Sequence, residues 1–439
     1  MFGDGQQQDY KKLQETLVRS SDPAVKNGHD LVNLIRFKSS KANSSSMWSK
    51  NLDLLVEVAN KLTGAEKTRF FGGTIPLMKE GVDFAKSTNL VGKFTTNKDH
   101  VTFSRQEIFN LLSCCFFCCF PESKGKDKLL NFSTLFEKRD NWKSDSVQKE
   151  KIKCLLNYFN LASQYYREDV MKETVNLTRS IVRQDPDWSN SKIPTVSPQL
   201  ILSGIAVGVP ASGMCRVDFA NKRIGGGVLA TGSLQEEIMF ITCPELIIAR
   251  FFSSEMKDNE AIFVSGLRQY SLHQGYAESF KCTGFLDLRS PESFCHRVVA
   301  MDALDFSNQP SWYQYEKHNV DRELRKAYAA FSAVDVMPIL SGNWGGGCFQ
   351  GDPVLKAKIQ MLAASEAGKI IHYDCFGKTE IQNAVLLNVN CNRKETVGNL
   401  CEEYLSLLEY CKDADAKQKA DFGNKQNRNK KRNQNGMLK

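Results

Sequence analysis

The sequence lacks the features that would place it in a membrane or on a secretory route. None of its segments approaches the roughly 20 unbroken apolar residues that a membrane-spanning helix requires. The initial segment MFGDGQQQDYKK has no apolar stretch of the kind found in signal peptides. We therefore expect a soluble, intracellular protein that does not bind a membrane.

Several short motifs of common enzyme classes are also missing. The sequence contains no G-x-x-x-x-G-K-[ST] loop, no G-x-G-x-x-G, no G-x-S-x-G and no H-E-x-x-H. These absences argue against a P-loop kinase, a dinucleotide oxidoreductase, a serine hydrolase and a zinc protease.

Cysteine is abundant, with 14 residues, but its arrangement does not favour a metal site. The densest group, in LLSCCFFCCF, consists of two adjacent pairs, and no histidine lies closer than His100 to complete a ligand set. Free cysteine often packs as a small buried apolar group. We predict that Cys114, Cys115, Cys118 and Cys119 pack in a helix core, and we predict no metal and no cofactor.

The net charge of +8 is concentrated at the end of the chain. Residues 412–439 contain nine Lys and Arg against three Asp, a net charge of +6, which leaves +2 for everything before them. This polar, basic segment is predicted to be a disordered tail. It is interpreted as a nuclear address, as a weak contact for nucleic acid or another polyanion, or as a solvated end without a role.

The remaining chain divides into two halves of different texture. Residues 1–170 carry apolar residues at helical spacing and predict a helical accessory domain, in which Ser104 and Glu107 form a capping box. Residues 171–411 alternate short β-rich runs with amphipathic segments, which predicts an α/β fold. A mixed sheet flanked by helices, with ligand loops at strand ends, is expected there.

Two glycine clusters each lie between a predicted strand and a predicted helix. The first, in VDFANKRIGGGVLATGSLQEE, contains Gly225, Gly226 and Gly227. The second, in LSGNWGGGCFQGDPVLK, contains Gly345, Gly346 and Gly347, followed by a helix start at Asp352 and Pro353. Backbone N–H groups in such loops bind anions. One cluster alone reads as a tight turn, whereas two favour a ligand with a diphosphate.

An acidic pair, Glu236 and Glu237, follows the first cluster in the first turn of a predicted helix that starts near Ser233. Glu236 matches a capping box with Ser233, so capping and ligand contact remain open for it. Glu237 has no such local role in the sequence pattern. A helix N-terminus stabilises a carboxylate anion, so a general acid here requires burial or a ligand charge to raise its pKa.

These segments together resemble the poly(ADP-ribose) glycohydrolase family. GGGVLATGSLQEE is similar to the signature of that family, with VDFAN before it and GYAESF, VAMDAL, GNWGGGCFQGD and CFG after it. The resemblance extends upstream to FPES and NFSTLFEKRD and so covers most of the chain. It implies a macrodomain-like catalytic domain beside the helical domain, a hydrolase of ribose–ribose bonds, and an intracellular setting in the nucleus, the cytoplasm or both, in the response to DNA damage.

The resemblance also implies roles for individual residues. Glu237 is expected to protonate the departing ribose 2′-oxygen and then to activate water, with Glu236 and Asp218 as supporting acids. Asn221 is expected to contact the terminal ribose, Gln235 the nucleotide side, and Phe349 the distal ribose. Residues 225–227 and 345–347 are expected to hold the diphosphate. Tyr276 and Phe376 are expected beside the adenosine half, although each aromatic side chain also suits an ordinary core.

Two other functions remain as alternatives. A macrodomain reader would bind ADP-ribose without cleaving it, but it would not need Glu236 and Glu237. An interaction protein would bind nucleic acid through its helical half, but the predicted helices carry no basic stripe interleaved with aromatic residues. We therefore expect poly(ADP-ribose), ADP-ribose and poly(ADP-ribosyl)ated proteins as partners, and a monomer.

Overall fold

The computed structural model describes most of the chain between residues 25 and 402. The described residues are 25–40, 50–93, 99–120, 130–201, 213–252, 255–294, 297–335, 338–389 and 396–402. The predicted basic tail at 412–439 lies outside these residues. Residues 202–212, which make up most of the segment directly before Asp218, lie outside them as well. In the described part, no helix is long and apolar enough to cross a membrane.

An eight-stranded mixed sheet forms the centre of the molecule, in the order β1-β2-β5-β8-β4-β9-β10-β3. Strands β8, β4, β9, β10 and β3 run parallel, whereas β1, β2 and β5 pair antiparallel at one side. The strands span His100–Ser104 (β1), Thr174–Ile181 (β2), Gln199–Ile201 (β3), Cys215–Ala220 (β4), Glu260–Ser265 (β5), Arg297–Asp302 (β8), Ile339–Gly342 (β9) and Ile371–Asp374 (β10). A separate hairpin contains β6 (Ser271–Gln274) and β7 (Lys281–Phe285).

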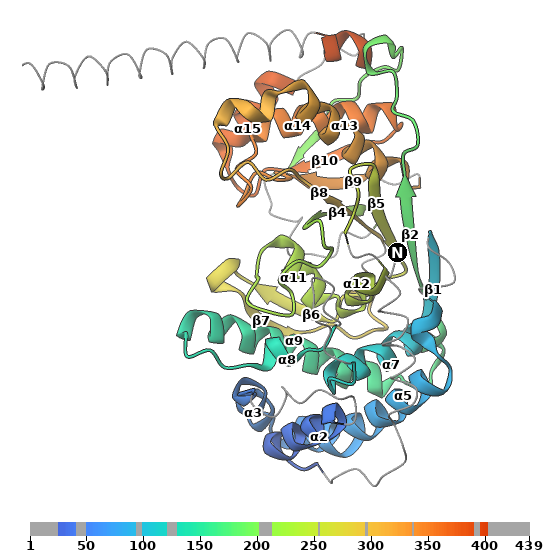
Figure 1. The fold of residues 1–439 in the computed structure, drawn as a ribbon, viewed down its shortest axis with the longest axis vertical. Coiled ribbons are helices and arrows are strands. Elements are labelled where there is room, and N and C mark those ends of the chain that lie inside the picture. Colours follow the sequence, from blue (N-terminus) through green and yellow to red (C-terminus); the bar gives the residue numbers. More distant parts are fainter. Residues whose placement is uncertain are drawn as a thin grey trace, which may run out of the picture.

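Helices cover both sides of this sheet (Figure 1). One side carries α13, α14 and α15, at Lys317–Ser332, Pro353–Glu366 and Thr379–Val389. The other side carries α11 (Gln235–Thr242) and α12 (Ala249–Phe252), joined by the 3-10 helix η6 (Pro244–Ile248). Helix α14 begins as predicted, because the side chain of Asp352 accepts a hydrogen bond from Leu355 N and Pro353 takes the first helical position.

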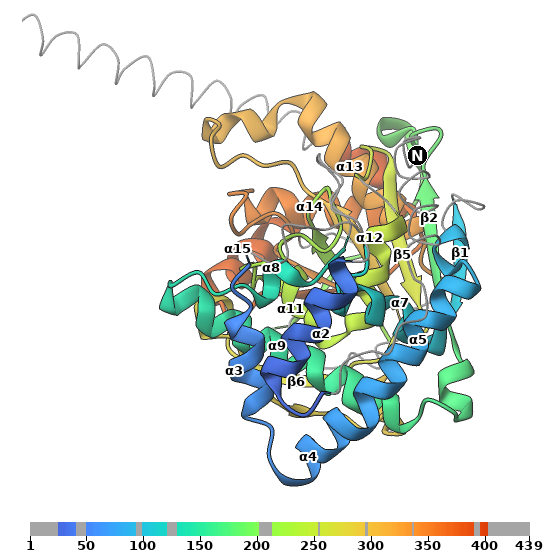
Figure 2. The ribbon, with the colours of Figure 1, turned by 60° about the horizontal axis from the view of Figure 1, so that its bottom comes forward.

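The helical half packs beyond α11 and α12, and the β6–β7 hairpin lies against its longest helix (Figures 1 and 2). Its helices are α2 (Gly28–Ser40), α3 (Asp53–Asn60), α4 (Gly64–Arg69), α5 (Ile75–Ser87), α7 (Arg105–Phe116), α8 (Ser133–Phe136) and α9 (Trp142–Gln164), with a π-helix, η2, at Phe70–Thr74. The predicted capping box of Ser104 and Glu107 is confirmed at the start of α7. The four clustered cysteines are buried in the core at the end of α7, as predicted.

The helical half is not purely helical, because it also contributes β1 to the sheet. Strand β1 pairs with β2, from Ser104 opposite Thr174 to His100 opposite Thr178. The alternating run HVTFS buries Val101 and Phe103 on one face, which is the pattern of a strand with one buried side. The run is only five residues long and continues directly into a helix, so its strand character is easily missed in the sequence.

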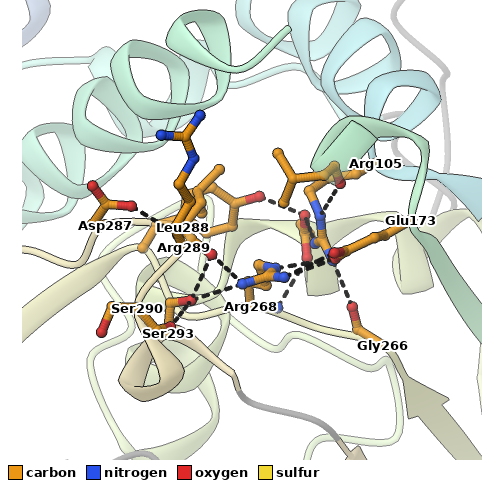
Figure 3. Close-up of polar contacts among 12 residues, drawn as sticks. Arg105, Glu173, Gly266, Arg268, Asp287, Leu288, Arg289, Ser290 and Ser293 are labelled. Atoms are coloured by element: carbon orange, nitrogen blue, oxygen red, sulfur yellow. Dashed lines mark hydrogen bonds and ion pairs between the residues drawn. The ribbon is translucent and has the colours of Figure 1, made fainter. Parts of the chain in front are cut away.

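A polar network, in which Arg105, Arg268 and Glu245 are buried and Glu173 is exposed, joins the two halves near β1 (Figure 3). Arg268 donates three hydrogen bonds to Glu173, at 3.2, 3.0 and 2.9 Å, and Arg105 donates to Gly266 O at 2.9 Å. Arg105 also pairs with Glu245, whose carboxylate accepts a hydrogen bond from the Tyr270 hydroxyl at 2.5 Å. The network places the start of α7 against the segment that follows α11. It therefore fixes the helical half relative to the sheet.

Candidate active site

The candidate site lies where β4, β9 and β10 end. These three strands are neighbours and run parallel, so their carboxyl ends meet at one edge of the sheet. The first glycine cluster follows β4, the second follows β9, and Phe376 follows β10. Ligands of open α/β sheets bind at such an edge. The topology thus brings together loops that are more than 100 residues apart in sequence.

Gln235, at the start of α11, fixes this helix to β4. Its amide nitrogen donates to Val217 O at 2.9 Å, and its amide oxygen accepts from Phe219 N at 2.9 Å. The side chain is buried and bonds to the strand on both sides of Asp218. The amide group thus aligns the helix with the strand, and the expected contact of Gln235 with the nucleotide stays a prediction.

Glu236 and Glu237 each bind the backbone of the first glycine loop. Glu236 accepts hydrogen bonds from Gly225 N at 2.5 Å and Asn221 N at 2.9 Å. Glu237 accepts from Gly227 N at 2.8 Å and from Leu234 N at 2.9 Å. Helix α11 begins at Gln235, so Glu237 rather than Glu236 reaches back to the residue before the helix. The predicted Ser233–Glu236 capping box is wrong, and Glu237 does have a local structural role.

These contacts also give acceptors within the protein to the amides of residues 225–227. The amides of Gly225 and Gly227 bind the two glutamates, and Gly226 N donates to Arg223 O at 3.1 Å. The expected role of residues 225–227 in holding a diphosphate stays a prediction. A Cβ at Gly226 would lie 2.5 Å from Glu237 Oε1 and 2.6 Å from Glu236 Oε2. Glycine is required there because the backbone passes directly against both carboxylates.

Asp218 completes a cluster of three acids. Its side chain is fully buried, and neither carboxyl oxygen has a hydrogen-bond partner within the described residues. Burial, with the charge of Glu237, raises the pKa of Asp218 well above its ordinary value. Burial and the neighbouring Asp218 likewise raise the pKa of Glu236, although the amides of Asn221 and Gly225 oppose this rise. Asp218 and Glu236 thus hold their protons more tightly than exposed acids do.

Two cations, the buried Lys151 and the partly buried Arg250, bind carbonyls of the glycine loop. Arg250, from α12, donates to Gly226 O at 2.7 Å. Lys151, from α9 of the helical half, donates to Gly227 O, Ala230 O and Gly232 O at 3.3, 2.8 and 2.6 Å. The loop therefore presents carbonyls to the cations and amides to the acids. The peptide between Gly226 and Gly227 does both, since its C=O binds Arg250 and its N–H binds Glu237.

The second glycine loop, residues 343–352, is organised differently. Its ends are closed by hydrogen bonds from Gly346 N to Asn343 O and from Gly351 N to Gly345 O, both 2.9 Å. At its tip, the amides of Gly347, Cys348 and Phe349 donate to no acceptor in the part of the chain that the structure describes. This loop keeps the pattern expected for anion binding, with consecutive amides that the protein does not use.

The remaining predicted residues surround the two loops. Asn221 is exposed directly after β4, and its side-chain oxygen accepts from Arg223 N, which leaves its NH2 group outward. Phe376 packs edge-on against Phe219, with ring centroids 6.3 Å apart. Tyr276 is 45% exposed. The pKa of its phenol is raised by partial burial and by the nearby Cys348 and Glu237, although a hydrogen bond from the Gln235 backbone opposes this rise. Tyr276 therefore lies near both loops.

Comparison with known proteins identifies the family of this chain. A family model described as the helical domain of poly(ADP-ribose) glycohydrolase matches residues 62–179, and a second, described as the macro domain fold of that enzyme, matches residues 185–383. The chain belongs to the poly(ADP-ribose) glycohydrolase family. The predicted fold, a macrodomain-like α/β half beside a helical half, is confirmed.

Named relatives extend this match along the chain. A probable poly(ADP-ribose) glycohydrolase 2 of Arabidopsis thaliana is 28% identical over 427 residues and covers 80% of each chain. Poly(ADP-ribose) glycohydrolase 2 of Caenorhabditis elegans is 30% identical and covers 64% of this chain and 59% of its own. A poly(ADP-ribose) glycohydrolase from Deinococcus radiodurans, solved in complex with ADP-ribose, covers 44% of this chain and 84% of its own at 14% identity, with a TM-score of 0.29. That score is too low to transfer geometry.

Membership of the glycohydrolase family does not single out Lys151 or Arg250, and the sequence pattern did not predict either. Lys151 lies in KEKIKCLLNYF, where it reads as one of several solvated lysines, and Arg250 lies in PELIIARFF. The sequence contains one partial indication that Lys151 is buried. It lies three residues before Cys154 and therefore on the same, buried face of α9. A lysine on an apolar helical face is costly unless it is paired, and this could have marked it.

Proposed function

We propose that the protein hydrolyses the ribose–ribose O-glycosidic bonds of poly(ADP-ribose) and releases ADP-ribose, with Glu237 as general acid and general base. Membership of the glycohydrolase family supports the reaction. The observation that carries the role of Glu237 is its position. Among the three clustered acids it keeps the largest exposure, 8% against 5% for Glu236 and 0% for Asp218, while two amides fix its carboxylate.

Two proton transfers at Glu237 would complete the reaction. In the first, its carboxyl group donates a proton to the 2′-oxygen of the departing ribose as the bond from that oxygen to the anomeric carbon breaks. In the second, the resulting carboxylate accepts a proton from water as the water oxygen bonds to the anomeric carbon. The residue returns to its starting protonation state, and one water is consumed for each bond cleaved.

The geometry also supports different roles for the two glycine loops. The first loop orients the acids, because its amides bind Glu236 and Glu237. The second loop is the better candidate for the diphosphate, through the amides at its tip. Backbone donors bind phosphate without lysine, in agreement with the low net charge of the chain before residue 412. A diphosphate held there would offset positive charge at the anomeric carbon.

The supporting acids would act through the same loop. Asn221 and Glu236 are linked by the Asn221 backbone amide, so the ribose contact expected of the Asn221 side chain would lie beside the acid cluster. Phe349 and Tyr276 would border the bound sugar and nucleotide. The raised pKa of Asp218 and Glu236 reduces the negative charge that an anionic substrate meets.

Release of ADP-ribose from purified polymer tests this proposal, with ADP-ribose binding measured in parallel. We expect the wild type to cleave, and Glu237→Gln to bind ADP-ribose but to lose at least about 100-fold in kcat. Glu66→Gln, on the exposed surface of α4, is the control and should retain full activity. Binding without cleavage by the wild type would identify a macrodomain reader and refute the mechanism.

A further inference from the structure

Lys151 belongs to the helical half, yet its ammonium group ends in the glycine loop that holds Glu237. The side chain is 1% exposed and reaches from α9 to the carbonyls of Gly227, Ala230 and Gly232. These three carbonyls come from the six residues 227–232, which begin at the last glycine of the first cluster and end shortly before α11. A long charged side chain is rarely buried unless it is needed to satisfy other groups.

The number of acceptors indicates the protonation state that this contact needs. An ammonium group has three N–H donors, which matches the three carbonyls, whereas a neutral amine has two donors and a lone pair. A neutral amine would place that lone pair against a carbonyl oxygen. The contact is therefore complete only when Lys151 is charged.

The carbonyl of Gly227 connects this contact to Glu237. Gly227 O accepts from Lys151 and also from Ala230 N and Gly232 N, so it is the central acceptor of the turn over residues 227–232. The amide of the same residue donates to Glu237 Oε1 at 2.8 Å. At the other end of the turn, a Cβ at Gly232 would lie 2.8 Å from Glu237 Cδ. The turn that Lys151 stabilises thus lies against the Glu237 carboxylate at both of its ends, Gly227 and Gly232.

We propose that Lys151 is a positioning residue for the glycohydrolase reaction, through which the helical half holds the loop of residues 227–232 around Glu237. The inference rests on the proposed function of Glu237. Lys151 does not touch the reacting atoms. It acts by fixing the peptide groups that orient the acid, and a misplacement of about 1 Å at such a group lowers a rate about 100-fold.

The charge requirement predicts a dependence on pH. Burial lowers the pKa of Lys151 to about 7. Glu237 on α11 and Cys154 on α9 oppose this shift, whereas Arg250 on α12 adds to it. As the pH rises through this value, Lys151 loses the proton that its third carbonyl contact needs. Activity should therefore fall as the pH rises through about 7, in addition to the fall caused by deprotonation of the general acid Glu237. Lys151→Arg, which stays charged, should remove only the step that Lys151 causes.

The test compares Lys151→Met, Lys151→Arg and Lys153→Met in the full chain. Lys153 lies on the same helix, but its side chain is only partly buried and pairs only with Glu150 among the described residues, so it serves as the matched control. For each protein we would measure the thermal unfolding midpoint, ADP-ribose affinity, and kcat and KM on purified polymer from pH 5.5 to 9. Wild type and Glu237→Gln are measured alongside.

We expect Lys151→Met to lower kcat by about 10- to 100-fold while ADP-ribose affinity changes less than about threefold. Lys153→Met should match the wild type. Equal kcat for Lys151→Met and the control would overturn the inference, as would a pH profile of Lys151→Arg that coincides with that of the wild type. If Lys151→Met does not fold, the pH profiles of wild type and Lys151→Arg decide. A wild type that does not cleave polymer would instead refute the proposed function.

Discussion

The close approach of Gly226 to both glutamates allows a sharp test of how precisely the acids must be held. In Gly226→Ala, the new Cβ would begin 2.5 Å from Glu237 Oε1 and 2.6 Å from Glu236 Oε2. An ordinary contact starts at 3.4 Å, so each carboxylate, or the loop, must move by about 0.8 to 0.9 Å. A displacement of this size at a catalytic group lowers kcat about 100-fold.

Gly226→Ala should also reduce stability, for a separate reason. Gly226 has φ of +42°, where a residue with a Cβ is strained by about 1–2 kcal/mol. Gly232→Ala separates the two effects, because its Cβ would contact Glu237 at 2.8 Å without a positive φ. Gly72→Ala, whose Cβ would meet nothing within 4 Å, is the control for adding a methyl group.

The assay is polymer hydrolysis under saturating substrate, with chemical denaturation of each variant. We expect kcat to fall about 100-fold in Gly226→Ala and by a comparable factor in Gly232→Ala, with the larger loss of stability in Gly226→Ala alone. Gly72→Ala should match the wild type in kcat. If both loop variants retain kcat within about threefold of the wild type, the orientation of Glu237 by this loop does not limit the reaction, and the reasoning fails.

Two further predictions concern buried charge. Glu245→Ala leaves Arg105 without its buried partner, so the free energy of unfolding should fall by about 3–5 kcal/mol in urea denaturation; a loss below about 1 kcal/mol would contradict this. For Asp218, the raised folded-state pKa means that its contribution to stability is full below about pH 4 and declines as pH rises through that pKa. The free energy of unfolding of Asp218→Asn, minus that of the wild type, should therefore be more than about 1 kcal/mol higher at pH 7.5 than at pH 4. The same difference at both pH values would refute this.

Much of the architecture follows from patterns within single segments. The runs MCRVDFA, HRVVAMDAL, MPILSG and KIIHYDCF are strands β4, β8, β9 and β10, because short β-branched and apolar runs between turns suit a sheet covered on both faces. Asp352 with Pro353 and Ser104 with Glu107 begin α14 and α7 as predicted, since capping is a local interaction.

The contacts that the sequence did not predict are interactions between distant segments. A sequence pattern indicates that residues 225–227 have free amides, but not that Glu236 and Glu237 will occupy them. It indicates that Gln235 is polar, but not that its amide will bond to β4. Lys151 and Arg250 reach the loop from other helices. In each case the partner is fixed by tertiary packing, which the local pattern does not contain.

The position of β2 has a consequence for how the chain can be divided. Strand β2 lies between β1 and β5, and it precedes residue 185, where the match to the macro domain family model begins. A fragment starting at residue 185 would expose the Glu260–Ser265 edge of β5, with unpaired N–H and C=O groups that invite intermolecular strand pairing. Such a fragment should aggregate. The two halves are therefore better regarded as one cooperative folding unit than as a catalytic module with a detachable accessory.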